Sequence, residues 1–570
     1  MEEYMEKYNN WLNSPIIDKE TKEELLSIKD DDNEIKERFT QNLEFGTAGL
    51  RGIIGNGTNR MNIYTVGMAT QGLADFINKN NPENKPVVIS YDSRNYSKEF
   101  SKQTALILNA NGIKTYLFDE LNPVPVLSFA IRELHCIAGV MITASHNPSK
   151  YNGYKVYFED GAQIVAPVAT GIIEEVNKIK LEDIKVTDEN NELFNMVPEY
   201  VFEKYINVLN GLVLNRDIIK EMNPNMKIVY TPLNGSGNKP VQTILKTIGF
   251  DNVYVVKEQE NPDGNFPTCP SPNPENPAVY ELALKLAEKE NADVILATDP
   301  DADRLGIYSF DKVSNTYKSF TGNMSALLIA EYRLSILKER ELIPDNGIIV
   351  KSLVSSNLAD AIANEYNLKL KDVLTGFKYI GEQIKLYEQN RDYTYLFGFE
   401  ESYGCLFGTY ARDKDGVAAV MALAEAAAYY KSKGLTLCDQ MENIYKKYGY
   451  YLEETVSIEK EGLAGIAEIQ KIMQNIRENP FKSISDYEVL SIKDYKLKTD
   501  INLISGETKE TDLPTANVLY YIIENDAWIA VRPSGTEPKI KFYVGVKESS
   551  KEEAENKFNK IKEFLLENIK

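Results

Sequence analysis

An acidic segment, Asp299-Pro300-Asp301-Ala302-Asp303, carries three carboxylates at alternate positions. It follows the apolar run Val294–Ala297, which is typical of a buried strand. In an extended backbone alternate side chains point to one side, so the three carboxylates are predicted to converge. Carboxylates held this close repel unless a hard cation neutralises them, and Mg²⁺ prefers such oxygen ligands. The spacing therefore predicts a magnesium site on Asp299, Asp301 and Asp303.

Two other motifs with closely spaced aspartates do not fit this segment. An EF-hand loop that started at Asp299 would need glycine at its sixth position and glutamate at its twelfth, where this chain has Arg304 and Phe310. A haloacid dehalogenase signature would need Thr or Val at the position of Arg304. A solvated acidic turn is the remaining alternative, and the apolar run before the segment argues against it.

A serine in a second loop, Thr143-Ala144-Ser145-His146-Asn147-Pro148, is a candidate reacting group. The proline prevents the apolar run before it from continuing as a strand or a regular helix, so the Ser145 hydroxyl is expected in a constrained loop. His146 is one of only two histidines in the chain, and Lys155 brings a cation close to the same loop. The alternative for such a stretch taken alone is a capping turn. No G-x-S-x-G motif surrounds Ser145, so acyl transfer of the hydrolase kind is not supported.

Near the C-terminus, the stretch Arg532-Pro533-Ser534-Gly535-Thr536-Glu537-Pro538-Lys539 has the composition of a phosphate-binding loop. Arginine offers a planar fork of donors, serine and threonine offer hydroxyls, and Gly535 lets backbone N–H groups approach an anion. The alternative is a surface turn with scattered charges.

Glu400 and Ser402, in Gly398–Gly404, have a spacing suited to hydrogen bonds with adjacent sugar hydroxyls. Cations flank this loop on both sides, at Lys378 in Thr375-Gly376-Phe377-Lys378 and at Lys414 in Arg412–Gly416. Alone, the Glu-x-Ser spacing indicates no more than a turn.

A glycine-rich stretch near the start, Phe45–Gly52, includes Arg51. It lacks the Lys-Ser/Thr pair of a P-loop and does not fit G-x-G-x-x-G. By itself it is a weak signal.

The elements that must position these loops form a degenerate repeat. Three segments each run from an amphipathic helix through a short turn into an apolar strand, namely 105–118, 244–256 and 362–374. Each is followed by another apolar strand that ends in a polar loop, in 137–148, 293–304 and 393–404. This alternation predicts parallel α/β sheets in three copies, and function in such sheets gathers in loops beyond the carboxyl ends of strands.

The 570 residues suggest roughly four domains at about 150 residues per domain. The first forty-odd residues have a helical pattern and are predicted to be an extension packed on the body. From about Tyr450 the pattern becomes β-rich and ends in a helix, Lys551–Ile569, which predicts a smaller α+β domain. The predicted domain limits are 1–205, 206–322, 323–446 and 447–570.

Composition restricts the partners and the compartment. Hydrophobic residues make up 43% and charged residues 26%, as in ordinary globular proteins, and the four cysteines form no C-x-x-C pair, which favours a reducing cytoplasm. The acidic start of the chain is unlike a signal peptide, and no apolar run approaches the roughly 20 residues that span a bilayer. The formal net charge of −21 argues against nucleic acid and anionic membranes as partners.

Taken in order, the motifs GTAGLRG, TASHNP, DPDADR, GFEESYG and RPSGTEPK resemble those of the α-D-phosphohexomutase superfamily. The resemblance spans about 45–543 and is strongest to the phosphoglucomutase/phosphomannomutase branch, particularly its longer members with an N-terminal helical extension. It implies an α/β fold with three related mixed-sheet domains and a C-terminal phosphatase-like α+β domain around a central cleft. One departure is Asn234, where relatives often carry histidine.

The resemblance also implies roles for individual residues. Ser145 matches the phosphorylated serine, whose phosphate completes a Mg²⁺ site on Asp299, Asp301 and Asp303. The matched basic positions near the reaction are Arg51, His146, Lys155, Arg304, Lys378 and Lys414. Glu400 and Ser402 match contacts to sugar hydroxyls, with Thr375, Gly376 and Lys378 as neighbouring substrate contacts, and Arg532, Ser534, Gly535 and Thr536 match the loop that holds the non-reacting phosphate.

The implied activity is interconversion of hexose 1-phosphate and hexose 6-phosphate through a phosphoserine and a sugar 1,6-bisphosphate. Glucose phosphate is favoured over mannose phosphate, and the sugar bisphosphate is expected as activator as well as intermediate. A phosphopentomutase of the same superfamily, a metal-dependent sugar phosphatase and a catalytically idle sugar-phosphate sensor are the alternatives.

Overall fold

The computed structural model describes residues 2–46, 49–460, 462–534 and 539–569. The chain forms two compact units. Unit 1 comprises Met1–Ile329, Phe377–Phe397 and Ser402–Leu437, and unit 2 comprises Ala330–Gly376, Gly398–Glu401 and Cys438–Lys570.

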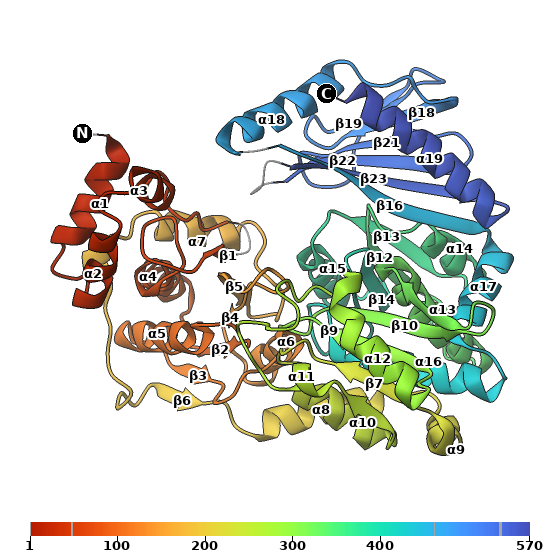
Figure 1. Ribbon diagram of the computed structural model, residues 1–570, viewed down its shortest axis with the longest axis horizontal. Helices are drawn as coiled ribbons and strands as arrows, with labels where there is room; N and C mark the ends of the chain where they lie inside the picture. Colours follow the sequence, from red (N-terminus) through yellow and green to blue (C-terminus); the bar gives the residue numbers. More distant parts are fainter. Residues whose placement is uncertain (1, 47–48, 461, 535–538, 570) are drawn as a thin grey trace. The chain divides into compact units, whose positions relative to one another are not determined.

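Three N-terminal helices, α1 (Glu3–Asn13), α2 (Lys19–Ser27) and α3 (Asp32–Phe39), confirm the predicted helical extension (Figure 1). Asp18 and Asp31 cap α2 and α3 by accepting from the N–H groups three residues on, which satisfies donors that have no partner inside the helix. The helices enclose a small apolar core that consists of Tyr8, Trp11, Ile17, Leu25, Ile35, Phe39 and Tyr64. The extension is therefore docked on α4 (Ile63–Asn80) through Tyr64.

The first sheet of unit 1 has the strand order β1-β5-β4-β2-β3-β6. Its bounds are β1 (Gly49–Ile53), β2 (Val87–Tyr91), β3 (Thr115–Leu117), β4 (Ala138–Ile142), β5 (Tyr151–Phe158) and β6 (Phe194–Met196). Strands β2, β3, β4 and β6 are parallel, whereas β5 runs antiparallel to both β4 and β1. Helices α4, α5 (Ser97–Ala110) and α6 (Val124–Glu133) accompany this sheet.

The second sheet repeats this arrangement in the order β11-β10-β9-β7-β8. Its bounds are β7 (Ile228–Thr231), β8 (Val253–Val255), β9 (Val294–Thr298), β10 (Leu305–Asp311) and β11 (Thr316–Phe320). The three strands β7, β8 and β9 are parallel, and β10 returns antiparallel beside β9. The helices α10 (Asn238–Ile248) and α12 (Glu281–Glu290) belong to this sheet region. The strand after each of the first two predicted loops therefore turns back, so these two sheets are mixed and not purely parallel.

The third region carries the same alternation of helix and strand. In unit 2, β12 (Gly347–Ser352) pairs in parallel with β13 (Lys369–Val373), and α14 (Leu358–Glu365) connects them. The remaining elements of this region are α13 (Gly322–Glu339), α15 (Phe377–Asn390), β14 (Thr394–Glu400), β15 (Gly404–Leu406), α16 (Gly416–Ser432) and α17 (Leu437–Tyr448). Helix α16 is apolar and buried around almost its whole surface, as expected of a central core helix.

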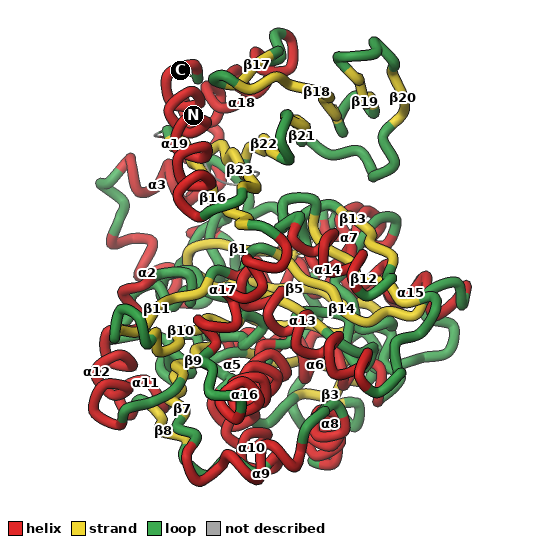
Figure 2. The backbone as a smooth tube through the Cα atoms, turned by 90° about the vertical axis from the view of Figure 1, so that its right-hand side faces the viewer, coloured by secondary structure: helices red, strands yellow, loops and turns green. Residues whose placement is uncertain are grey.

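The C-terminal part of unit 2 confirms the predicted α+β pattern. Its sheet has the order β16-β23-β22-β21-β18-β19-β20, with β17 paired to β18, and neighbouring strands run antiparallel. The bounds are β16 (Tyr450–Glu459), β17 (Ser483–Ile484), β18 (Tyr487–Asp494), β19 (Thr499–Asn502), β20 (Thr508–Glu510), β21 (Leu519–Ile523), β22 (Ala527–Pro533) and β23 (Lys539–Glu548) (Figure 2). Helix α19 (Lys551–Asn568) confirms the predicted terminal helix, and α18 (Gly462–Glu478) is a further helix that the β-rich pattern did not predict.

The other elements are short or peripheral. They are α7 (Val168–Val176), α8 (Tyr200–Gly211), α9 (Arg216–Met222), α11 (Lys257–Glu260) and 3₁₀ turns at Leu181–Asp183, Asn223–Asn225 and Pro277–Tyr280. Within the described ranges, no helix combines the length and the apolar character that crossing a membrane requires.

The docking of the N-terminal helices can be tested at Trp11, whose ring meets those of Phe39 and Tyr64 edge-on at 5.7 and 5.4 Å. Trp11→Ala should weaken the docking by about 3–5 kcal/mol, because it opens a cavity in a small core. Trypsin should then cut the first forty residues faster, as followed by mass spectrometry. In the control Leu26→Ala, where the side chain is already 49% exposed, cleavage should stay as in the wild type. Equal cleavage of the Trp11 variant and the wild type would contradict a docked extension.

Candidate active site

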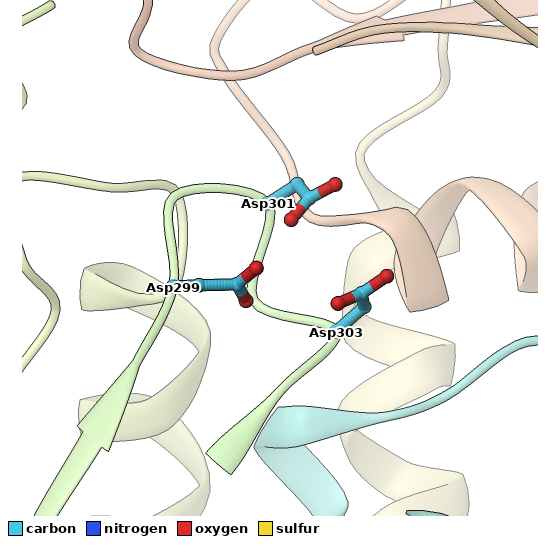
Figure 3. Close-up of side chains that lie close together, drawn as sticks. All are labelled: Asp299, Asp301 and Asp303. Atoms are coloured by element: carbon cyan, nitrogen blue, oxygen red, sulfur yellow. The ribbon is translucent and has the colours of Figure 1, made fainter. Parts of the chain in front are cut away.

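The three aspartates predicted to bind a metal lie together in unit 1. Ligand oxygens of Asp299, Asp301 and Asp303 all lie within 4.8 Å of one another, and the three residues are almost fully buried. Figure 3 shows the three side chains projecting from a single turn. The predicted extended backbone was wrong, since Ala302 has a φ of 46° and its N–H donates to Asp299 O at 2.9 Å. A tight turn between β9 and β10 therefore makes the carboxylates converge.

Three other segments hold this acidic turn by its carbonyl groups. Pro300 O accepts from both the N–H and the hydroxyl of Ser236, at 2.8 and 2.7 Å. At the starts of α6 and α16, Val124 N–H donates to Asp301 O at 3.0 Å and Gly416 N–H donates to Ala302 O at 3.1 Å. The conformation of the turn thus depends on contacts that are remote in sequence.

Asn234, the departure noted in the sequence, supports the segment that carries Ser236. It is 2% exposed, its N–H donates to Gln259 O at 2.8 Å, and its side-chain amide donates to Asn261 O at 2.8 Å. Leu233 and Asn234 both have positive φ, which asparagine tolerates better than most residues. These hydrogen bonds of Asn234 fix the backbone next to Ser236, which in turn binds Pro300 O.

Two lysines bring positive charge to the acidic cluster. Lys155 Nζ lies 2.8 Å from Asp301 Oδ2 and 3.9 Å from Asp303 Oδ2, and Lys414 Nζ lies 3.2 Å from Asp303 Oδ2. Burial and the charges of the other two aspartates raise the pKa of Asp299 well above its usual range. Burial also acts to raise the pKa of Asp301, but Lys155, Asp299 and Lys414 together hold that pKa below the usual value. Asp299 is thus the acid that most needs a further cation in order to ionise.

The cluster has free coordination capacity on oxygens of the right kind. Asp301 Oδ1 and Asp303 Oδ1 are buried and make no hydrogen bond within the described part of the chain. A buried carboxylate oxygen without a partner is costly unless a cation approaches it. Oxygen ligands are those that Mg²⁺ and Ca²⁺ prefer, so the donor set fits a hard divalent cation.

Ser145 occupies the loop after β4 and points at this cluster. Its hydroxyl donates to Asp299 Oδ2 at 2.8 Å and lies 3.2 Å from His146 Nδ1. The residue is 3% exposed and has a φ of 52°, a left-handed conformation that is uncommon for serine. The predicted constrained loop is confirmed, and a simple capping turn does not describe a hydroxyl bonded to a carboxylate 154 residues away.

Sheet register places two of the predicted basic residues. Arg51 on β1 pairs with Gly153 on β5, and Lys155 is two residues further along β5, so Arg51 and Lys155 project from the same face of the sheet. Arg51 Nη1 donates to Asn147 Oδ1 at 3.3 Å, in the serine loop. The antiparallel pairing of β1 with β5 therefore places Arg51, from the glycine-rich stretch, beside the serine loop.

Lys414 approaches the cluster from another loop of unit 1, whereas Arg304 directly follows Asp303 in the acidic turn itself. Asp413 accepts from Lys414 N–H at 2.8 Å and from the Tyr157 hydroxyl at 2.9 Å, which anchors the backbone that carries Lys414. A Cβ on Gly404 would lie 1.9 Å from Lys414 Cδ, so only glycine leaves room for the lysine stem. Arg304 Nε lies 3.8 Å from Asp303 Oδ1, and its Nη1 lies 2.8 Å from Glu275.

The predicted sugar contacts divide between the two units. In unit 2, Glu400 is 4% exposed and accepts from Gly376 N–H at 2.6 Å, and Thr375 Oγ1 is buried without a hydrogen bond in the described chain. In unit 1, Ser402 is partly exposed in the turn after β14, and Lys378 lies near the start of α15. The structure brings Glu400 and Gly376 together.

The predicted phosphate-binding loop lies at the end of β22 in unit 2. Arg532 pairs with Lys541 across β22 and β23, and Ser534 N–H donates to Lys539 O at 2.7 Å. Gly535 and Thr536, the other two predicted members, lie outside the described residues.

The sequence analysis missed Asp92, Arg94 and the role of Thr143. Asp92 and Arg94 directly follow β2, the parallel neighbour of β4, and Arg94 donates to Ser145 O at 2.5 Å. The signal that could have identified them is the polar stretch Asp92-Ser93-Arg94 at the carboxyl end of the apolar strand 87–91.

Comparisons with known proteins agree with this arrangement. Models of the four domains of phosphoglucomutase/phosphomannomutase match the chain in order. The alpha/beta/alpha domains I, II and III match residues 42–183, 203–311 and 321–448, and the C-terminal domain matches 499–560.

Similar sequences and structures cover nearly the whole chain. A phosphoglucomutase of Staphylococcus saprophyticus is 38% identical over 522 residues, which are 90% of this chain and 92% of that protein. A phosphoglucomutase of Staphylococcus epidermidis is 36% identical over 94% of this chain and 96% of its own length. Among solved structures, a putative phosphomannomutase of Thermus thermophilus has a TM-score of 0.69 at 20% identity, over 93% of this chain and 100% of that one. The open form of the Paramecium phosphoglucomutase parafusin has a TM-score of 0.67 at 18% identity, over 92% and 95%.

The partly exposed His146 gives the site a testable pH dependence. Burial and the guanidinium groups of Arg304 and Arg51 hold the pKa of His146 well below its usual range. Below pH of about 6.5 the unfolded chain therefore binds a proton that the folded chain does not, and the free energy of unfolding falls as pH falls. His146→Gln should reduce this loss between pH 7 and pH 5, as measured by urea unfolding.

The matched control is His135→Gln, at the exposed second histidine of the chain. Its stability should depend on pH as that of the wild type does. An unchanged pH dependence in the His146 variant would show that the ring is not held neutral by its surroundings.

Proposed function

The chain belongs to the phosphoglucomutase/phosphomannomutase family, and on that premise we propose that it interconverts hexose 1-phosphate and hexose 6-phosphate, with glucose phosphates as the favoured substrates and mannose phosphates as a second choice. It is then an intramolecular phosphotransferase. The observation that carries the proposal is the hydroxyl of Ser145, 2.8 Å from the Asp299 carboxylate of a buried acidic cluster.

The proposed reaction starts with a phosphoryl group on Ser145. The bond between Ser145 Oγ and phosphorus breaks as the free hydroxyl of a sugar monophosphate bonds to that phosphorus and loses its proton, and Ser145 Oγ takes up a proton. The product of this half-reaction is a sugar 1,6-bisphosphate, which also serves as the activator that phosphorylates Ser145. The bisphosphate then turns over within the site. Its other phosphoryl group bonds to Ser145 Oγ, which loses its proton, and the sugar oxygen that it leaves is protonated, which gives the isomeric monophosphate.

We propose that Asp299, Asp301 and Asp303, together with the phosphate on Ser145, hold Mg²⁺. When bound, the ion supplies charge neutralisation to the transferring phosphoryl group. Asp301 Oδ1 and Asp303 Oδ1, which are buried and make no hydrogen bond within the described residues, support this assignment. Lys155 and Lys414 add positive charge beside the same carboxylates, and phosphoryl transfer depends mainly on such charge and on alignment.

Proton transfer and orientation fall to the remaining basic residues near Ser145. His146 Nδ1 lies 3.2 Å from the serine oxygen, and its low pKa keeps the ring neutral. Arg51 and Arg304 carry fixed charge to the same loops. These contacts support all three residues as members of the catalytic set.

The substrate contacts are proposed from the family resemblance. Glu400 and Ser402 would bind sugar hydroxyls, and the bond between Glu400 and Gly376 N–H supports a preformed sugar loop. The neighbouring contacts would come from Thr375, Gly376 and Lys378. The non-reacting phosphate would be held by Arg532, Ser534, Gly535 and Thr536.

We also propose that the domains meet at 205/206, 322/323 and 446/447. The same proposal places the protein in the cytoplasm. All four cysteines, Cys136, Cys269, Cys405 and Cys438, are free thiols, which supports a reducing compartment.

The central test is Ser145→Ala, assayed for conversion of glucose 1-phosphate with Mg²⁺ and glucose 1,6-bisphosphate. Turnover should fall by more than about 10³-fold, because the group that carries the phosphoryl is gone. Ser149→Ala, four residues along the same loop, should keep wild-type turnover. Appreciable mutase activity in the Ser145 variant would contradict the mechanism.

The same assay separates the alternatives. A sugar phosphatase would release inorganic phosphate in place of isomer, a phosphopentomutase would prefer ribose 1-phosphate, and an idle sensor would bind the sugar phosphate without turnover.

The metal assignment predicts that EDTA abolishes turnover and that Mg²⁺ restores it. Asp303→Asn should raise the half-saturating Mg²⁺ concentration by about 10–100-fold, because a ligand charge is lost. The control is Asp311→Asn, a buried acid on β10 that is bonded to Ser314 outside the cluster. An Asp303 variant with the Mg²⁺ dependence of the wild type would exclude this residue as a ligand.

A further inference from the structure

The serine loop is gripped by one arginine that the catalytic scheme does not use. Arg94 donates through Nη1 to Pro148 O and Tyr151 O, both at 3.0 Å. Through Nη2 it donates to Ser145 O at 2.5 Å and to Asn147 O. All four acceptors are carbonyl groups of 145–151, the segment that joins β4 to β5. The terminal guanidinium nitrogens of Arg94 thus bind one short stretch of backbone at four points.

A second path reaches Ser145 from its other side. Ser145 N–H donates to Thr143 Oγ1 at 2.8 Å, and the Thr143 hydroxyl donates to Asp92 Oδ2 at 2.6 Å. The same oxygen, Asp92 Oδ2, lies 3.4 Å from Arg94 Nε. Both peptide groups that flank Ser145 are therefore tied, directly or through Thr143, to the ion pair of Asp92 and Arg94.

The ion pair is enclosed, which makes these contacts directional and rigid. The side chains of Asp92 and Arg94 have no solvent exposure. The ring of Phe266 lies 5.1 Å from the guanidinium carbon of Arg94, and Ser97 Oγ donates to the remaining oxygen of Asp92 at 2.8 Å. Charge-assisted hydrogen bonds of this kind are stronger than neutral ones and have no water to compete with.

We infer that Arg94, acting with Asp92 and Thr143, is a positioning residue that holds Ser145 in its left-handed conformation and so aims the reacting oxygen at the acidic cluster. The inference rests on the proposed mutase function and adds residues that touch neither the substrate nor the phosphoryl group. Serine rarely adopts this conformation unaided, so the surroundings must impose it. Without the grip, rotation of the Ser145 backbone would carry Oγ away from Asp299.

The geometry requires a guanidinium group and not merely a positive charge. Four acceptors spread along 145–151 need the planar fork of arginine, whereas a lysine has three donors on one atom and cannot span them. Arg94→Lys therefore keeps the charge beside Asp92 but loses most of the four hydrogen bonds to the serine loop. Its kcat should fall by about 10²-fold, the effect expected of a reacting atom displaced by about 1 Å. Its KM for glucose 1-phosphate should stay within about threefold, since no substrate contact is removed.

The matched control is Arg60→Lys in the same sheet domain. Arg60 is 6% exposed, and its guanidinium bonds to Glu37 at 2.8 Å and to Asn59 O at 3.1 Å, both outside the serine loop. Arg60→Lys should lower the melting temperature about as much as Arg94→Lys does and leave kcat within about twofold. This comparison separates a loss of positioning from a general loss of stability.

A second pair of variants decides the matter if Arg94→Lys does not fold. Thr143→Val keeps the size of this buried residue and removes the hydroxyl that links Ser145 N–H to Asp92, whereas Thr143→Ser keeps the hydroxyl. The valine variant should lose at least about tenfold in kcat, and the serine variant should stay within about threefold of the wild type.

Two readouts are taken on each full-length protein with Mg²⁺, namely steady-state mutase turnover and the rate at which glucose 1,6-bisphosphate phosphorylates Ser145, measured by mass spectrometry. The inference is supported if Arg94→Lys and Thr143→Val are phosphorylated more slowly than the wild type while Arg60→Lys and Thr143→Ser are not. A wild type that is phosphorylated but does not isomerise sugars would overturn only the proposed function. The inference is overturned by wild-type rates in folded Arg94→Lys, by equal rates in Thr143→Val and Thr143→Ser, or by a wild type that is never phosphorylated at Ser145.

Discussion

The repulsion among three buried carboxylates is the constraint on which the rest of the site depends. Two unit charges 4.8 Å apart repel by about 3 kcal/mol at an effective dielectric constant of about 20, and Asp299, Asp301 and Asp303 form three such pairs. Lys155 and Lys414 offset part of this cost, and Asp299 remains the acid whose pKa is raised most. A cluster that is expensive to build and lies beside a serine hydroxyl is explained by a cation and a phosphoryl group, the two partners of the proposed reaction.

The first sheet positions Ser145 and the second positions the three aspartates through the same arrangement of strands. In each, a buried parallel strand ends in a polar loop, and the next strand returns antiparallel beside it, as β5 does beside β4 and β10 beside β9. The loop is therefore closed at both ends by strand pairing and has little freedom of its own. Residues 145 and 302 nevertheless have positive φ, which costs roughly 1–2 kcal/mol for a residue with a side chain. Hydrogen bonds from distant segments, worth about 0.5–1.5 kcal/mol each between neutral groups and more from a charged donor such as Arg94, offset that cost at both turns.

Glycines mark the places where chain segments must approach the site most closely. A Cβ on Gly416 would lie 2.7 Å from Ala302 O, and one on Gly404 would overlap the stem of Lys414. Gly404 makes room for the lysine that pairs with Asp303, and Gly416 makes room for the backbone of the acidic turn, so the geometry of the cluster also depends on positions that have no side chain.

The sequence by itself determined the alternation of helix and strand, the loops after β4 and β9 and the identity of Ser145 and the three aspartates, because these follow from local apolar patterns and from chemistry carried by single residues. It also predicted the helical extension and the C-terminal α+β pattern, apart from α18. Only the tertiary structure decided that the aspartates converge through a turn, that Arg51 shares a face with Lys155, and that Asp92 and Arg94 grip the serine loop. Those outcomes depend on strand register and on contacts between residues tens to hundreds of positions apart, which no local pattern encodes.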